Sequence, residues 1–192
     1  MKTLARLGLI LLITVKLFTY GCAAKKICTV TMPCRTKLSN YDCLLIRQFT
    51  YSQDFREKKI KDEEDEWKAN KLREMCQERV QYHIYTLSLF EDVVDAECPD
   101  DAYNIVVLQG EITYMKRVTK ATRIMAGAMG GRARVDVDIQ LVDLQTGDVV
   151  GAASVKGTSK GVDFWLGVRG APTEEAFENA AQIIAEFIKN SY

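Results

Sequence analysis

Residues 133–157 read ARVDVDIQLVDLQTGDVVGAASVKG, and this stretch decides the fold. Apolar and polar side chains alternate strictly in its first half, which predicts a half-buried antiparallel strand with one apolar face. A three-residue loop at Gln145, Thr146 and Gly147 would turn the chain, because glycine adopts the left-handed conformation that a bulged hairpin requires. This register places Val137 opposite Val155, so that the apolar side chains of both strands share one face.

The other face of this hairpin is charged. The same register sets Asp136 opposite Lys156, and Arg134 and Asp138 share the face of Asp136. We interpret these residues as a solvated charge ladder, which is a simpler account than a pair of catalytic carboxylates.

Several other segments predict strands. Residues 41–51 carry an apolar run typical of a central strand, residues 89–95 predict a short strand, and residues 103–115 predict a long one. Gly110 is the expected site of a bulge in the long strand. Residues 54–62 are charged and predict a loop.

Two long helices complete the pattern. The acidic run from Asp62 to Glu66 suits the positive end of a helix dipole, and the stripe that follows predicts a helix from Glu63 to Tyr85, with Trp67 on its buried side. A second helix is expected after a cap at Thr173. Its core stripe consists of Phe177, Ala180, Ala181, Ile184 and Ile188.

The predicted fold class is α+β with two layers, in which both helices pack on one face of a mixed, largely antiparallel sheet. The predicted organisation is a signal peptide at residues 1–21, a tether at residues 22–40 and a single domain at residues 41–192. With 26 basic and 26 acidic residues, the chain lacks the basic surface that nucleic-acid binding requires.

The N-terminus indicates the compartment. Lys2 and Arg6 precede an apolar run from Leu7 to Val15, which is short for a membrane span and typical of a signal peptide. The sequence Gly21-Cys22-Ala23-Ala24 resembles the lipobox of bacterial lipoproteins, which implies that Cys22 is acylated with palmitate and becomes the mature N-terminus. The residue after this cysteine implies sorting to the outer membrane, facing the periplasm. An uncleaved anchor, or a signal peptide removed by the ordinary peptidase, are the alternatives.

Five further cysteines remain after Cys22. Because Cys28 and Cys34 are close in sequence, we consider them the first candidates for a disulfide. Cys43 and Cys76 lie in apolar patterns that favour buried, inert thiols. The usual zinc patterns are missing, and we expect neither a metal nor a cofactor.

No catalytic motif emerges from the sequence. The glycines of residues 125–131 lead into a strand rather than a helix, so they do not fit a phosphate-binding loop. His83, the only histidine, has no partner at catalytic spacing and is interpreted as a packing or capping residue. We therefore expect no enzymatic activity.

The best candidate for a contact site is the apolar segment of residues 162–168, where Phe164, Trp165 and Leu166 would either fold onto the domain or bind a partner. Two functions follow from the sequence. The first is a lipid-anchored accessory or assembly factor that acts through contacts with another envelope protein. The alternative is a periplasmic module that binds a small ligand in a pocket under residues 162–168.

The order of motifs resembles an uncharacterised bacterial lipoprotein family of the DUF4410 type, a domain of unknown function. The resemblance rests on the segments Leu89 to Val93, Val107 to Ile112 and Leu141 to Gly147, together with the alanine-rich last helix. More distantly, the layout is similar to that of curli-secretion lipoproteins, which implies protein binding without catalysis.

Overall fold

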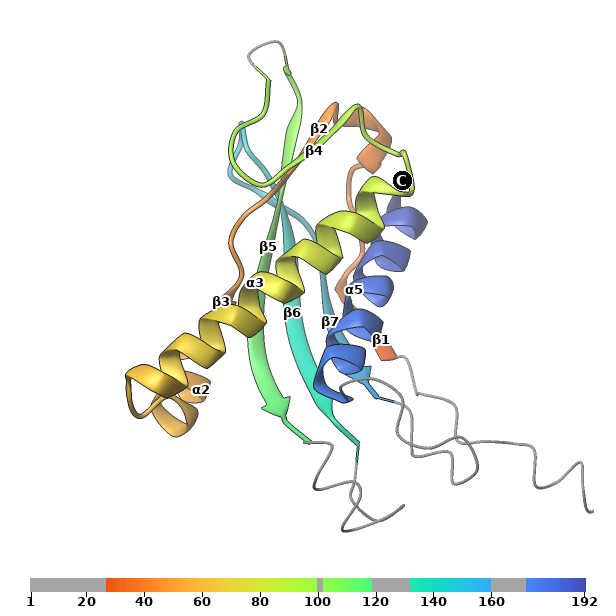
Figure 1. The fold of residues 1–192 in the computed structure, drawn as a ribbon. Helices are drawn as coiled ribbons and strands as arrows, with labels where there is room; N and C mark the ends of the chain where they lie inside the picture. Colours follow the sequence, from red (N-terminus) through yellow and green to blue (C-terminus); the bar gives the residue numbers. More distant parts are fainter. Residues whose placement is uncertain (1–26, 100–101, 119–131, 160–171) are drawn as a thin grey trace, which may run out of the picture.

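The computed structural model describes residues 27–99, 102–118, 132–159 and 172–192. These residues form one seven-stranded mixed sheet with three α-helices (Figure 1). The strand order is β1-β7-β6-β5-β2-β4, and β3 pairs with β5 off this path. The strands are β1 (Ile27–Met32), β2 (Cys43–Ile46), β3 (Thr50–Tyr51), β4 (Asp92–Val94), β5 (Ile105–Lys116), β6 (Arg134–Asp143) and β7 (Val149–Thr158).

The sheet is mixed because its long and short strands pair differently. The long strands β5, β6 and β7 and the edge strand β1 pair antiparallel, whereas the short strands β2, β3 and β4 pair parallel. The helices are α2 (Gln53–Lys59), α3 (Glu63–Tyr85) and α5 (Pro172–Ser191), with a short 3-10 turn η1 at Leu38–Asn40. Both long helices lie on the same face of the sheet (Figure 1), so the two-layer prediction holds, with a third helix added.

The predicted β6–β7 hairpin is confirmed. Val137 pairs with Val155 and Asp136 with Lys156, and Gly147 has a φ of 75°, in the left-handed region. The outer face is polar, as expected. There the guanidinium of Arg134 binds Asp136, and Ser154 donates a hydrogen bond to Asp138 at 2.6 Å.

Gly110 has a different role from the one predicted. The register shift of β5 falls between Ile112 and Tyr114, not at Gly110. A Cβ built on Gly110 would lie 2.7 Å from ring carbons of Phe49, which is fully buried. The missing side chain therefore lets an aromatic ring lie flat against the strand.

Helix α3 begins and ends where the sequence predicts. Asp62 caps it by accepting a hydrogen bond from the Asp65 backbone N–H at 2.8 Å. Cys76, Val80 and Ile84 are fully buried along its inner side. Trp67, however, is 62% exposed, so its predicted place on the buried side is wrong.

Residues 54–62 do not form the predicted loop, because most of them belong to α2. The Ser52 hydroxyl caps this helix, and its one buried residue, Phe55, stacks on Tyr51 with ring centroids 4.9 Å apart. Because Phe55 is the only buried residue of α2, the sequence shows no amphipathic pattern that would predict this helix. On α5 the predicted stripe is buried, but the helix already begins at Pro172, so Thr173 is not its cap.

The predicted tether of residues 22–40 is wrong from Ile27 onward. Residues 27–32 form β1, which pairs with β7, and Leu38 in η1 is fully buried. Among the described residues, the folded domain therefore includes residues 27–40 and does not begin only at Tyr41. No helix among the described residues is long and apolar enough to cross a membrane.

Candidate functional site

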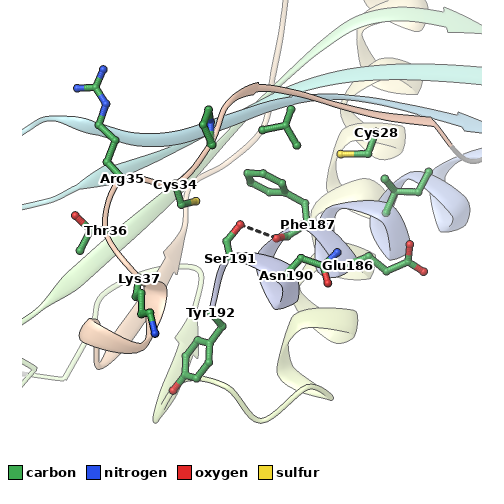
Figure 2. Close-up of a pocket in the computed structure, with 13 residues that line it drawn as sticks. Cys28, Cys34, Arg35, Thr36, Lys37, Glu186, Phe187, Asn190, Ser191 and Tyr192 are labelled. Carbon is green, nitrogen blue, oxygen red and sulfur yellow. Dashed lines mark hydrogen bonds between the residues drawn. The ribbon is translucent and has the colours of Figure 1, made fainter.

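A cleft of about 660 Å³ lies between β1, the segment that follows it, and the last turns of α5 (Figure 2). It is larger than three other clefts on the described residues, which measure about 460, 390 and 240 Å³. Its volume falls within the roughly 300–1,000 Å³ of ligand-binding pockets. We take this cleft as the candidate site.

The wall formed by β1 follows from the period of a strand. Cys28 and Val30 are two residues apart, so both point to the same side of the sheet. Their partners on β7 are Val155 and Ala153, whose buried side chains face the helices. Because β1 is an edge strand, Val30 remains 50% exposed at the mouth of the cleft.

The opposite wall comes from the end of α5. Ile183 and Phe187 form its apolar floor, and they are only 2% and 5% exposed. The Ser191 hydroxyl donates a hydrogen bond to the Phe187 carbonyl at 2.9 Å, which closes the last turn of the helix (Figure 2). Beyond it, the ring of Tyr192 packs edge-on against Phe90, with centroids 5.7 Å apart.

Charged residues line the rim of the cleft. Arg35 and Lys37 follow β1 and are exposed, while Glu186 lies on the helix side (Figure 2). Neither basic side chain forms an ion pair with a residue that the structure describes. The rim can therefore offer two positive charges to a partner.

Two thiols line the cleft. Burial, with a smaller contribution from the charge of Glu186, raises the pKa of the Cys28 thiol, so that Cys28 stays protonated near neutral pH. The Cys34 sulfur packs on Gly151, where a Cβ would overlap it. Neither arrangement activates a thiolate for nucleophilic chemistry.

The predicted Cys28–Cys34 disulfide is wrong, because both residues are free thiols. Cys28 lies opposite Val155 and Cys34 contacts Gly151, four residues away along β7. Four residues of strand span about 13 Å, which exceeds the roughly 7 Å limit between Cα atoms of a disulfide.

The structure instead joins Cys43 on β2 to Cys98, after β4. The predicted inert thiol at Cys43 is therefore also wrong. Cys43 is fully buried yet lies outside the main core cluster. The disulfide thus holds the segment after β4 onto the sheet. Cys76 is a buried free thiol, as predicted.

His83 has charged partners that its place in the sequence did not reveal. Its Nε2 lies 2.6 Å from Glu178 on α5, and Arg79 of α3 also donates to this carboxylate. The three residues hold the two long helices together. Among the described residues, no group of three or more His, Cys, Asp and Glu side chains could hold a metal ion.

Several of the site residues predicted from the sequence fall outside the part of the chain that the structure describes. Cys22 and the segment with Phe164, Trp165 and Leu166 lie outside the described residues. Sequence reasoning missed the cleft itself. The available signal was the run Ile27-Cys28-Thr29-Val30-Thr31-Met32, whose β-branched residues before Pro33 are typical of a strand.

A family model described as "Domain of unknown function (DUF4410)" matches residues 46–160, which is more than half of the chain. The chain therefore belongs to this family. No curated protein matches its sequence.

Two solved structures are similar to this chain at low sequence identity. The PelC dodecamer from Paraburkholderia phytofirmans is 16% identical with a TM-score of 0.50, and the match covers 84% of this chain and 97% of PelC. Protein XCC0632 from Xanthomonas campestris, of the DUF330 family, is 10% identical with a TM-score of 0.48. That match covers 82% of this chain and 87% of the Xanthomonas protein.

Proposed function

We propose that this member of the DUF4410 family is a lipid-anchored protein of the bacterial cell envelope that acts, without catalysis, as an accessory or assembly factor. In this proposal the lipid is attached at Cys22, the protein faces the periplasm from the outer membrane, and a protein partner binds in the cleft between β1 and α5.

The disulfide between Cys43 and Cys98 supports an envelope location. Disulfides persist in oxidising compartments such as the periplasm and are rare in the cytosol. The pattern from Lys2 to Cys22 agrees with export and lipid attachment.

The early start of the domain makes the anchor short. Five residue steps separate Cys22 from Ile27, so β1 starts at most about 18 Å from the lipid attachment point. The cleft, which begins at Cys28, would then lie close to the membrane surface. A partner in this cleft would itself be at the membrane.

The exposed edge strand beside the cleft is the observation that carries protein binding. An open strand edge offers unpaired backbone groups, and an apolar groove next to it can take the side chains of an added segment. PelC, which shares the fold, is described as a dodecamer, so in that protein the fold supports protein contacts.

Two experiments test the proposal. Metabolic labelling with a palmitate analogue should mark the wild-type protein, and Cys22→Ala should abolish both the label and membrane fractionation. A photo-crosslinker at Val30 should capture a defined envelope protein, whereas one at Tyr82, which is 65% exposed on α3, should not. If the Cys22→Ala protein remains labelled and membrane-bound, the lipid anchor at Cys22 is disproved. If the crosslinker captures no defined protein at either Val30 or Tyr82, binding of a protein partner is disproved.

A second candidate function is binding of a small periplasmic ligand, which the volume of the cleft favours. The substitution Val30→Trp would fill the mouth of the cleft. It should abolish any thermal shift that a metabolite produces with the wild-type protein. The pocket predicted under residues 162–168 lies outside the described residues, as do Phe164, Trp165 and Leu166, which we retain as partner-binding candidates.

A further inference from the structure

The two edges of the sheet carry opposite charges. Strand β1 forms one edge and β4 the other. Residues 27–41 contain two basic residues and no acidic one, whereas residues 86–99 contain four acidic residues and no basic one. We call β1 with Arg35 and Lys37 the basic edge, and β4 with Glu91, Asp92, Asp95 and Glu97 the acidic edge.

These charges are available for contacts with another molecule. Arg35 and Lys37 are exposed, and so are three of the four acidic residues, with Asp92 half-buried. None of the six forms an ion pair with a residue that the structure describes. Both edges therefore present charges that have no salt-bridge partner within the described parts of the chain.

The two charged regions lie at the same level along the strands. The Arg35 backbone N–H donates to the Val150 carbonyl at 2.9 Å, which places Arg35 beside the start of β7. From the start of β7, a row of paired residues leads across the sheet to Val94 on β4. The row runs through the pairs Val149–Val142, Val142–Val107, Val107–Leu45 and Leu45–Val94.

The disulfide fixes the acidic edge in place. Cys98 follows Glu97 directly and is bonded to Cys43 on β2, so the segment after β4 cannot swing away from the sheet. On the other side, pairing with β7 holds β1 in place, and among the described strands β1 has no second partner. Both surfaces are thus held in position before any contact forms.

We propose that a second copy of this chain docks its acidic edge against the basic edge of the first, giving a head-to-tail homo-oligomer. Because the two edges are at one level, a rotation about an axis parallel to the strands brings them together. This inference rests on the proposed function, since it names the occupant of the β1 side of the cleft.

The charges disfavour the symmetric alternative. A twofold dimer whose axis passes near Arg35 and Lys37 would bring these positive charges close to their own copies, and one whose axis passes near the acidic residues of β4 would do the same for the negative charges. Like charges across an interface are unfavourable, whereas the head-to-tail arrangement pairs opposite charges.

The test compares charge reversals on the two edges. The full-length protein, extracted from membranes in detergent, is sized by light scattering with the detergent mass subtracted. Arg35→Glu with Lys37→Glu, or Glu91→Lys with Asp95→Lys and Glu97→Lys, should each weaken self-association about tenfold or more, because attractions become repulsions. Raising NaCl from about 0.05 M to about 0.5 M should also dissociate the wild type.

Mixing the two reversed proteins is the decisive step. One then carries two acidic edges and the other two basic edges, so the mixture should regain the oligomer that neither forms alone. Lys59→Glu with Lys61→Glu makes the same charge change as the basic-edge reversal, on exposed residues away from both edges, and should leave the wild-type size unchanged.

Three results would overturn the inference: a wild-type monomer at low salt, an acidic-edge reversal that assembles normally, or a mixture that stays dissociated. The crosslink at Val30 separates this failure from that of the proposed function. If Val30 captures a different envelope protein while the chain itself is monomeric, the proposed function stands and the self-assembly is wrong.

Discussion

The Nε2 atom of His83 on α3 lies 2.6 Å from the Oε1 atom of Glu178 on α5, which links the two helices that cover the sheet. Arg79 donates to the other carboxylate oxygen, and Gln182 donates to Oε1 at 3.2 Å. Burial alone would raise the pKa of Glu178, but the hydrogen bonds from Arg79 and His83 outweigh it and hold this pKa below its usual value.

Glu178→Gln should lower the free energy of unfolding at neutral pH by about 1–2 kcal/mol, because Arg79 loses its carboxylate partner. Since the pKa of Glu178 is lower in the folded than in the unfolded state, its stabilisation is complete above the unfolded value of about 4.3 and is lost as the pH falls through the folded value. Urea unfolding at about pH 6 and about pH 3 should show that the free energy of unfolding falls more for the wild type than for the variant as the pH is lowered. An equal fall in the free energy of unfolding for both proteins would contradict the stabilising role of Glu178.

Removing the disulfide with Cys98→Ala should lower the free energy of unfolding by about 2–4 kcal/mol, because Cys43 and Cys98 are 55 residues apart and their bond restricts the unfolded chain. A reductant should destabilise the wild type by a similar amount and leave the variant unaffected. Cys28→Ala, which removes a free thiol, is the control and should keep the reductant sensitivity of the wild type.

The free thiols should differ in their reactivity. Burial raises the pKa of Cys76 to about 12, so its thiolate is scarce and inaccessible in the folded protein. Maleimide should label Cys34 and the exposed Cys28 in the native protein, and Cys76 only after unfolding. Mass spectrometry of peptides over time distinguishes the three sites, and rapid native labelling of Cys76 would be the contrary result.

Gly110→Ala should lower the free energy of unfolding by about 1–3 kcal/mol, since the new Cβ would lie 2.7 Å from the ring of Phe49. Adding Phe49→Leu should make the alanine better tolerated than it is in the wild-type background. Denaturation of the two single variants and the double variant measures this coupling. Gly147→Asn is the control, because nothing lies within 4 Å of that position and asparagine tolerates its positive φ.

Elements with a strong local signal were predictable. The alternation from Arg134 to Leu141 and the turn glycine Gly147 determined both strands of the hairpin and their register. Helix α3 was equally clear, because an acidic cap at Asp62 precedes a long amphipathic stripe. In both cases residues close in sequence carry the whole pattern.

Features that depend on distant residues were not predictable. Strand β1 is stabilised by pairing with β7, more than a hundred residues away, and its own residues are mostly exposed. Cys98 meets Cys43 only because the parallel pairing of β2 with β4 brings the two segments together. The cleft was missed for the same reason, since its walls come from opposite ends of the chain.

The pairing of Ile27 with Lys156 also sets the order in which the sheet can form. A chain synthesised from its N-terminus must keep β1 unpaired until β7 has been made, and closing so long a loop is slow compared with forming the local β6–β7 hairpin. The second wall of the cleft, at the end of α5, is made later still. The cleft therefore exists only once α5 has packed beside β1, and whatever binds there can distinguish a folded domain from an unfolded one.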